Sequence, residues 1–261
     1  METNIESAQS NRLRYAQFDS WLKYLFAPSS IEEFLASCSE DRPFHLPPLP
    51  YEFAALEPAM DRESLFWHHQ VLHRAHVENL NIALKGRFIK VGTRVEEVFL
   101  KTAQFPILAR EEAKAHWNHS FFWQIMTSRS GETGLTETLW YAMRKSFDSF
   151  QNFQKEFVRI GMGLQGSGWI WLLTQPNHQL KIVTTRNQDN PLENWDQRFD
   201  LPLLACDLWE HCYYLQYKAR REFFLRRFLD LIDWRKIHLI FIAQSQIHKT
   251  KEVRPFDHLY D

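Results

Sequence analysis

Residues 201–217 read LPLLACDLWEHCYYLQY, and the interpretation of the whole chain starts from this stretch. Its first nine residues have the composition of a buried strand, and a helix is predicted from about 210 to 230. Asp207 and His211 then lie one helical turn apart, where the strand meets the helix. A carboxylate and an imidazole at this spacing can bind one metal ion, although the pattern is more often a surface ion pair.

Two further strands are predicted ahead of this stretch. Residues 166–175 and 179–186 are rich in β-branched and aromatic side chains, and the turn sequence PNH separates them. This pattern predicts a β-hairpin. Together with residues 201–209, the hairpin predicts a small antiparallel sheet of three strands.

Most of the remaining sequence has helical periodicity. Residues 61–128 are interpreted as a long helical hairpin, interrupted near residues 85–94 by two glycines. Helical periodicity returns in residues 133–164 and in a last helix at 234–247. The order of elements predicts an α+β fold, in which an N-terminal long helical hairpin is followed by a C-terminal domain of a three-stranded antiparallel sheet surrounded by helices.

The chain divides into four parts on this interpretation. An N-terminal helical extension covers residues 1–42, and the helical hairpin domain covers residues 43–130. A C-terminal α/β domain covers residues 131–245, and a tail covers residues 246–261. A proline-rich strap at the start of the hairpin domain is expected to lie extended over the surface, because proline removes backbone donors.

Composition and charge limit the possible functions. The chain has 261 residues and a formal net charge of −1, so bulk charge gives no support for binding to nucleic acid or to an acidic membrane surface. No apolar run is long enough to cross a membrane. Three cysteines, Cys38, Cys206 and Cys212, fit a reducing compartment. We expect a cytoplasmic protein, with a mitochondrial or other organellar location left open by Arg12 and Arg14.

Four histidines stand within WHHQVLHRAH at residues 67–76. On a helical wheel, His68 lies in the middle of an apolar face, and the other three histidines lie on the adjacent flank. The residues predicted to share the face of His68 are Leu65, Val71, Leu72, Ala75 and Asn79. Spacing alone favours the flank histidines, His69, His73 and His76, as metal ligands. Burial favours His68, because an imidazole in an apolar stripe needs a partner.

A second histidine, His119 in HWNHSFFW, has the same kind of surroundings. The residues on its predicted face are Ala115, His116, Phe122, Trp123 and Met126. A single histidine on an apolar face is usually a core residue with a satisfied hydrogen bond. Taken separately, therefore, none of these patterns establishes a metal site.

Taken together, six segments resemble one known family. LPPLPYEFAALEP, FWHHQVLHRAHVENLN, NHSFFW, GSGWIWL, NQDNPL and CDLWEHCYYLQY occur in the order found in iron/manganese superoxide dismutases. The resemblance covers about residues 43–240. It implies that His68, His119, Asp207 and His211 bind one metal ion, and that the chain converts superoxide to dioxygen and hydrogen peroxide.

The resemblance also implies which metal is used. Three imidazoles and a carboxylate suit manganese or iron, and zinc cannot change oxidation state. In the family a glutamine side chain hydrogen-bonds the solvent on the metal. Manganese types take it from the NQD turn, here Gln188, and iron types take it from the helix position occupied here by Ala115. Ala205 is neither the glycine common in manganese enzymes nor the threonine common in iron enzymes. We expect manganese, with iron possible.

Five other positions match functional residues of the family. Trp123 and Trp169, together with Trp209, match the aromatic wall around the metal. Glu210 and Tyr214 match positions of the dimer interface, so a homodimer, or else a tetramer, is expected.

Arg221 matches an arginine near the substrate funnel, where positive charge would attract a small anion. The sequence departs from the family there, because Glu222 replaces the following proline, and Gln165 replaces the phenylalanine of the FGSGW pattern.

Two departures affect the expected proton path. His76 replaces the usual gate tyrosine, and Leu72 replaces a histidine that leads to Tyr214 of the partner subunit. Because free tyrosine titrates near pH ~10 and free histidine near pH ~6.5, we expect activity to change over a lower pH range if His76 is the proton donor. The alternative is that His76 only fills space.

Three functions remain as hypotheses. The first is a catalytic superoxide dismutase. The second is a superoxide-dismutase-like structural or metal-binding protein with little dismutase activity, which the extension and altered gate residues would suit. The third is a metal protein with another redox activity, such as a peroxidase-like reaction. The presence of all four ligands and Gln188 favours the enzyme.

Overall fold

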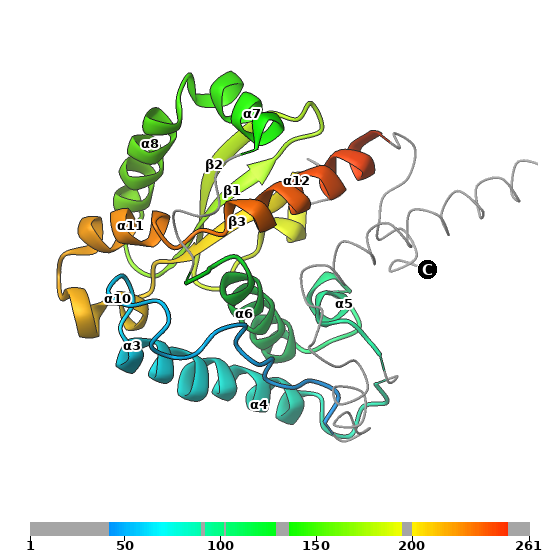
Figure 1. The fold of residues 1–261 in the computed structure, drawn as a ribbon. Helices are drawn as coiled ribbons and strands as arrows, with labels where there is room; N and C mark the ends of the chain where they lie inside the picture. The colour runs from blue at the N-terminus through cyan, green and yellow to red at the C-terminus, as the bar shows by residue number, and fades with distance from the viewer. Residues whose placement is uncertain (1–41, 90–91, 102, 129–135, 195–199, 250–261) are drawn as a thin grey trace, which may run out of the picture.

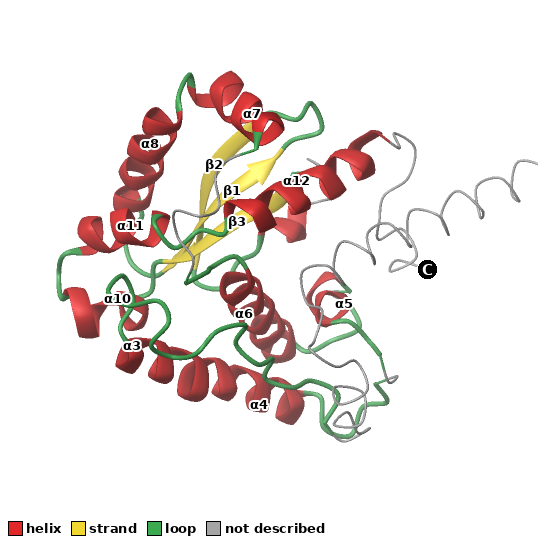
Figure 2. Cartoon of the chain, in the orientation of Figure 1, coloured by secondary structure: helices red, strands yellow, loops and turns green. Residues whose placement is uncertain are grey.

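The computed structural model describes residues 42–89, 92–101, 103–128, 136–194 and 200–249. The α+β fold predicted from the sequence is confirmed (Figure 1). A helical hairpin forms the lower half in this view, and the three-stranded sheet with its surrounding helices forms the upper half (Figure 2). The first 41 residues of the predicted extension and residues 250–261 of the predicted tail lie outside the described residues.

The first arm of the hairpin is a helical rod of three successive segments. These are α3 (Arg62–Phe66), the π-helical segment η1 (Trp67–His73) and α4 (Arg74–Ala83). Asp61 begins the rod as its N-cap, because its side chain accepts a hydrogen bond of 2.7 Å from the backbone N–H of Ser64.

The second arm is α6 (Ile107–Gln124), preceded by the short helix α5 (Val95–Leu100). The sequence prediction of one helix after residue 94 was wrong here, because the chain leaves helical geometry between α5 and α6 and Pro106 is the N-cap of α6. Proline favours a helix start, since it has no N–H to pair. Side chains are buried around the whole circumference of α6 from Ala113 to Trp123, so this helix lies at the centre of the molecule.

The sheet is antiparallel with the order β2-β1-β3. The strands are β1 (Gly168–Thr174), β2 (Leu180–Arg186) and β3 (Leu201–Asp207). Every residue of β1 and of β3 is buried, as expected for strands with both faces covered. Trp169 pairs with Asp207 in the register of β1 and β3, so the end of β3 lies beside the start of β1.

Helices cover the sheet on its two sides. Helices α7 (Glu137–Phe147) and α8 (Phe150–Gly163) pack against β1 and β2, whereas α6 and α12 (Trp234–Lys249) contact β3. Helix α12 continues past the predicted boundary at residue 246. No helix within the described residues is both long and apolar enough to span a membrane.

Two stretches predicted to be helical from the sequence, residues 133–164 and about 210–230, each contain two helices. Asp148, at φ 65°, ends α7, and the side chain of Ser149 then accepts a hydrogen bond from the backbone of Asn152 to begin α8. Lys218, at φ 54°, ends α10 (Glu210–Tyr217) before α11 (Arg221–Leu229) begins. Hydrophobic periodicity continues across both breaks, which is why it did not reveal them.

Candidate metal centre

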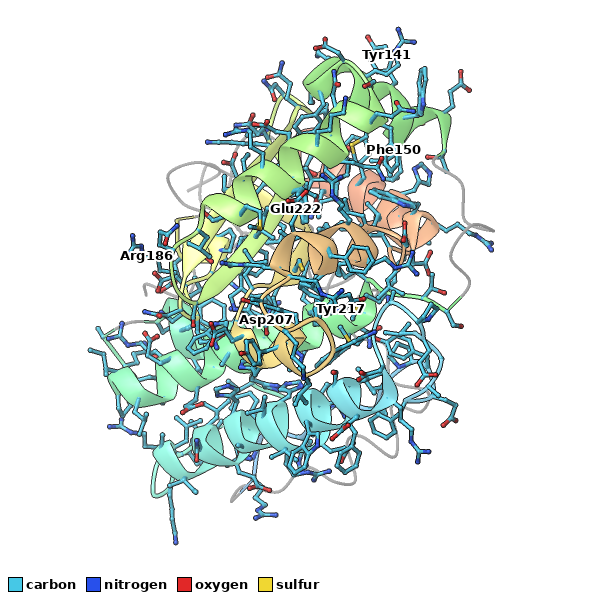
Figure 3. The ribbon with its side chains drawn as sticks, turned by 90° about the vertical axis from the view of Figure 1, so that its left-hand side faces the viewer. Tyr141, Phe150, Arg186, Asp207, Tyr217 and Glu222 are labelled. Atoms are coloured by element: carbon cyan, nitrogen blue, oxygen red, sulfur yellow. The ribbon has the colours of Figure 1, made fainter. Side chains whose placement is uncertain are left out.

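Four side chains from four different elements meet between the hairpin and the sheet. His68 comes from η1, His119 from α6, Asp207 from the end of β3 and His211 from α10. One potential ligand atom from each lies within 4.8 Å of all the others. Figure 3 shows Asp207 between the helices of the hairpin and the α10 region. The structure thus brings together the four residues that the resemblance nominated.

Asp207 is the centre of this cluster. Its Oδ2 atom lies 3.1 Å from Nε2 of His68, 3.6 Å from Nε2 of His119 and 3.2 Å from Nε2 of His211. The other oxygen, Oδ1, accepts a 2.8 Å hydrogen bond from the backbone N–H of Trp209, the N-cap of α10. The junction of β3 and α10 therefore fixes the carboxylate so that one oxygen faces all three imidazoles.

The π-helical segment changes which histidines point inward. His68, His69 and His73 are all buried, with 1%, 2% and 0% of their surface exposed. The helical wheel placed His69 and His73 on the flank beside the apolar face, but both are as buried as His68. The inward placement of Val71 was wrong, because Val71 is 40% exposed. Hydrogen bonds from residue i to i+5 widen the turn and bring more side chains to the same side, and such segments occur frequently at functional sites.

Among the predicted neighbours of His68, Leu65 is fully buried, whereas Ala75 and Asn79 are exposed. The wheel was therefore correct for the helix before the π-helical segment and wrong after it, because the segment shifts the phase of α4.

His119 is oriented by its own helix. Its Nδ1–H donates a 2.7 Å hydrogen bond to the backbone carbonyl of Ala115, one turn earlier in α6. A carbonyl can only accept, so the proton of the neutral ring lies on Nδ1 and the lone pair lies on Nε2. This orientation directs the unprotonated nitrogen of His119 towards Asp207.

The charges in the cluster suit metal binding. Burial lowers the pKa of His68 to about 4, and burial together with the charge of His68 lowers the pKa of His119 well below its usual range. Burial alone would raise the pKa of Asp207, but the charge and hydrogen bond of His211 hold it well below the usual range. At neutral pH the site therefore contains neutral imidazoles from His68 and His119 beside an ionised carboxylate, which are the forms that bind metals.

A metal ion bound here would also satisfy ligand atoms that the protein leaves without a hydrogen bond. Nε2 of His68 and Nε2 of His119 are buried, and although both lie close to Oδ2 of Asp207, neither makes a hydrogen bond of suitable geometry within the described residues. Buried polar atoms without partners are costly, and bound ions are one of the few explanations for them. Three imidazole nitrogens and one carboxylate oxygen are a donor set suited to manganese, iron or zinc.

Comparison with known proteins shows the family of the chain. Residues 43–127 match the family model for the alpha-hairpin domain of iron/manganese superoxide dismutases, and residues 135–239 match the model for their C-terminal domain. The chain belongs to the iron/manganese superoxide dismutase family. It is 37% identical over 208 residues to "Superoxide dismutase [Mn] 3" of Leptolyngbya boryana, which covers 78% of this chain and 85% of the relative. It is 35% identical over 224 residues to "Superoxide dismutase [Mn] 1" of the same organism, which covers 84% and 87%.

Gln188, which lies in the NQD turn, is buried and held in place by several contacts. Its side-chain Oε1 accepts hydrogen bonds of 3.1 Å from Trp169 and 3.5 Å from Asn118, and Asn118 also donates to its backbone carbonyl at 3.0 Å. Lys114 of α6 lies 3.3 Å from Asp189 in the same turn. These contacts fix the NQD turn on α6 and leave the amide N–H groups of Gln188 available as donors.

The tryptophans surround the cluster as the family pattern implies. The rings of His68 and Trp123 lie 4.8 Å apart, and those of His119 and Trp169 lie 5.1 Å apart. Trp209 stacks on His211 at 5.7 Å. Trp123 and Trp169 are almost fully buried, so they exclude water from two sides of the cluster.

The remaining predicted positions lie around the cluster rather than inside it. Glu210 and Tyr214 project from α10 and are exposed, Tyr214 by 50%. Arg221 uses both terminal nitrogens on backbone carbonyls, donating to Leu164 at 2.9 Å and to Leu208 at 3.3 Å. Its position is therefore fixed by backbone carbonyls at one end of the sheet, just before the start of β1 and just after the end of β3.

His76 lies beside the cluster and has a partner that sequence analysis did not identify. Its ring lies 5.3 Å from the ring of His119, and its Nδ1 lies 2.6 Å from Oε2 of Glu112 on α6. Glu112 precedes His119 by seven residues, or two helical turns, so it is on the same face of α6. That spacing was the available signal, but a glutamate on a helix is too common to be informative by itself.

A second feature missed by sequence analysis is a chain of buried hydrogen bonds. Trp123 donates from Nε1 to Nδ1 of His73 at 3.0 Å, and His73 then donates from Nε2 to Nδ1 of His116 at 2.8 Å. The ring of His73 also stacks on that of His119 at 5.2 Å. This chain holds the metal-facing helices together through neutral imidazoles.

The buried His116 predicts that acid destabilises the protein. Burial, followed by the charge of His76, lowers the pKa of His116 to about 3, whereas unfolded histidine titrates near ~6.5. The unfolded chain therefore binds a proton that the folded chain does not, and the free energy of unfolding falls as pH decreases between these values. The expected contribution of this one group is about 1.4 kcal/mol per pH unit.

Urea unfolding of the metal-free protein across this pH range tests the prediction. In His116→Gln the free energy of unfolding should depend less steeply on pH, by up to one proton, because glutamine can accept the His73 hydrogen bond and does not titrate. If the free energy of unfolding had the same pH dependence in the two proteins, the prediction would be contradicted.

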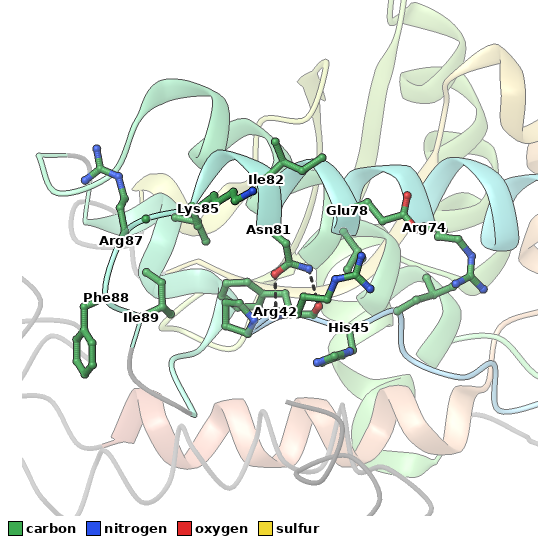
Figure 4. A pocket seen from close by; sticks show the side chains of 16 residues that line it. Arg42, His45, Arg74, Glu78, Asn81, Ile82, Lys85, Arg87, Phe88 and Ile89 are labelled. Atoms are coloured by element: carbon green, nitrogen blue, oxygen red, sulfur yellow. Dashed lines mark hydrogen bonds between the residues drawn. The ribbon is translucent and has the colours of Figure 1, made fainter. Parts of the chain in front are cut away.

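A cavity of about 690 Å³ lies at the far end of the hairpin and is separate from the cluster (Figure 4). It is bordered by α4, by the strap near Phe44 and by residues 84–89. Asn81 connects α4 to the strap, accepting a 3.1 Å hydrogen bond from the backbone N–H of Phe44 and donating a 2.8 Å bond to its carbonyl. None of the four converging side chains lines this cavity, so it is not the metal site.

Proposed function

We propose that the chain is an active superoxide dismutase in which His68, His119, Asp207 and His211 hold a single manganese ion, or iron as the second choice. The observation that carries the proposal is the convergence of their four ligand atoms within 4.8 Å in a buried, tryptophan-lined site. The relatives named as manganese superoxide dismutases support the choice of metal. The structural or metal-binding alternative has no comparable observation in its favour.

The overall reaction converts two superoxide ions and two protons into dioxygen and hydrogen peroxide. When bound, manganese or iron supplies the ability to take an electron from one superoxide and return it to another, which zinc lacks. The protein supplies neutral nitrogen donors and one negative charge, and it holds them in fixed positions. The negative charge of Asp207 would favour the more oxidised state of a bound ion.

Gln188 supports manganese rather than iron as the metal. Its side-chain carbonyl oxygen accepts hydrogen bonds from Trp169 and Asn118, so the amide N–H groups are the part of the side chain left to donate. The alternative position on α6 is the buried Ala115, which cannot hydrogen-bond through its side chain. We assign Gln188 the role of setting the potential and orienting solvent at the metal.

His76, Arg221 and the tryptophans have supporting roles in this proposal. His76 borders His119 and is assigned the delivery of protons from solvent. Arg221 is assigned the attraction of superoxide by its charge, since both of its terminal nitrogens already bond backbone carbonyls. Trp123 and Trp169 keep the site dry.

We propose that the exposed face of α10 forms part of the interface of a homodimer. Glu210 and Tyr214 are exposed there, and the nearby arm of the hairpin exposes Phe66 by 44% and Trp67 by 48%. In the dimer Glu210 would accept a hydrogen bond from His211 of the partner subunit. Sedimentation equilibrium should give twice the chain mass for the wild-type protein and a shift towards monomer for Glu210→Ala. A wild-type monomer that is fully active would contradict this assignment.

A cytoplasmic location completes the proposal. Cys206 and Cys212 are buried and free, which suits a reducing compartment. Burial also raises the pKa of both thiols well above their usual range, so they remain protonated and unreactive.

The function is tested by reconstitution with single metals. Portions of the same metal-free preparation are loaded with Mn, Fe or Zn, metal content is measured, and superoxide decay is followed by stopped-flow absorbance. The Mn-loaded protein should accelerate decay most strongly, and the Zn-loaded protein should leave it at the spontaneous rate. The proposal would be overturned if superoxide decayed at its spontaneous rate both with protein that binds one Mn per chain and with protein that binds one Fe per chain.

A further inference from the structure

The gate position of this chain holds a pair of residues rather than one. His76 on α4 and Glu112 on α6 approach each other to 2.6 Å, between Nδ1 and Oε2. Their side chains are only 25% and 14% exposed, so the contact is largely shielded from solvent. The pair joins the two arms of the hairpin beside His119, whose ring lies 5.3 Å from that of His76.

The second oxygen of Glu112 is also held by α4. Nδ2 of Asn79 donates to Oε1 of Glu112 at 3.4 Å, and Asn79 lies three residues after His76 on the same helix. Both carboxylate oxygens therefore face one side of α4. A carboxylate held in this way cannot rotate freely, and it fixes the rotation of the imidazole it contacts.

The contact also determines which nitrogen of His76 can exchange protons. An ionised carboxylate only accepts hydrogen bonds, so Nδ1 of His76 must carry the hydrogen whether the ring is neutral or charged. Nε2 is then the nitrogen left to accept a proton from solvent or to donate one. Without the carboxylate, the neutral ring could place its hydrogen on either nitrogen.

We propose that Glu112 is a positioning residue for proton delivery, which holds His76 in its Nδ1–H form so that Nε2 is the proton-exchanging atom. The inference rests on the proposed dismutase function and on the role assigned there to His76. It adds Glu112 as the carboxylate that a histidine at the gate requires. A tyrosine at this position would exchange its only proton through one oxygen and would need no such partner.

The first test measures the tautomer directly in the full chain without metal. Nitrogen-15 NMR of His-labelled protein gives the protonation of each ring nitrogen, and the His76 signal is assigned as the one missing from His76→Gln. We expect the Nδ1–H form in the wild-type protein and a mixture, or the Nε2–H form, in Glu112→Leu. Glu112→Asp should restore part of the Nδ1–H form. An unchanged tautomer in Glu112→Leu would overturn the proposal.

The second test is a double-mutant cycle on the Mn-loaded protein. Glu112→Leu should lower the rate of superoxide removal about tenfold at unchanged metal content. In a His76→Tyr background the same substitution should have no effect, because the residue it positions is absent. An equal loss in both backgrounds would show a merely structural role and would overturn the proposal.

A matched control separates the loss of this pair from the loss of any ion pair. Glu156→Leu removes a hydrogen-bonded contact to Arg159 on the exposed face of α8 and should leave both the tautomer and the rate unchanged. If Mn-loaded wild-type protein has no activity, the dismutase proposal fails. The tautomer measurement still reports whether Glu112 controls His76 in that case.

Discussion

Asp207→Asn is expected to reduce bound manganese below about a tenth of the wild-type content and to return superoxide decay to its spontaneous rate. The reason is that Oδ2 of Asp207 is the single atom lying within 3.1 to 3.6 Å of Nε2 of all three ligand histidines. The substitution removes the only negative charge of the cluster and leaves a neutral amide in its place. Metal analysis and stopped-flow decay measure the two effects.

The asparagine variant tests charge rather than shape. Its Oδ1 can still accept the hydrogen bond that the backbone N–H of Trp209 donates to Asp207 at 2.8 Å, so the junction of β3 and α10 is retained. Asp230→Asn is the matched control, because it also replaces a carboxylate by an amide, here one that contacts Arg227 at 2.9 Å on the surface of α11. This variant should keep the metal content and activity of the wild-type protein. Wild-type metal content and rate in Asp207→Asn would contradict the assignment of this residue as a ligand.

Gly168→Ala is expected to lower the free energy of unfolding by about 3 kcal/mol or more. An added Cβ would lie 2.0 Å from the backbone oxygen of Thr185, 2.9 Å from Cδ2 of Leu164 and 3.1 Å from Cα of Arg186. Two of these atoms belong to the backbone of β2 and cannot move without separating the strands. Urea unfolding monitored by circular dichroism measures the change.

The same substitution should also weaken the metal site. The carbonyl of Gly168 accepts a 2.9 Å hydrogen bond from the backbone of Leu208, and the next residue, Trp169, pairs with Asp207. Gly163→Ala is the control, since nothing lies within 4 Å of its added Cβ, and it should be neutral or stabilising by up to about 1 kcal/mol. Equal stabilities of the two variants would contradict the argument.

The class and order of the elements could be predicted from local sequence patterns. β-branched and aromatic content marked β1 and β2, and a buried apolar run marked β3, because strands covered on both faces need such residues. The breaks after α7 and α10 could not be predicted in the same way. Each depends on one residue with positive φ, Asp148 and Lys218, and neither is the glycine that usually announces such a turn.

Local sequence patterns likewise predicted some residues of the candidate site and missed others. Asp207 and His211 stood out because their spacing and their place at a strand-to-helix junction are local. His68 was chosen by an apolar face that η1 then altered, and the burial of His73 depended on the widened turn. Glu112 was not predicted, because it becomes significant only when α6 packs against α4 and brings it to His76.

By itself, the sequence determined the types of residue available for chemistry, their order, and the family to which the chain belongs. Only the tertiary structure decided that Nε2 of His68 and Nε2 of His119 meet Oδ2 of Asp207, and that Glu112 is the partner that holds His76. The physical reason is the distance along the chain over which each kind of interaction acts. Strand and helix preferences depend on neighbours within a turn or two, whereas the site is made by side chains that only the packing of separate helices and strands brings within hydrogen-bonding distance.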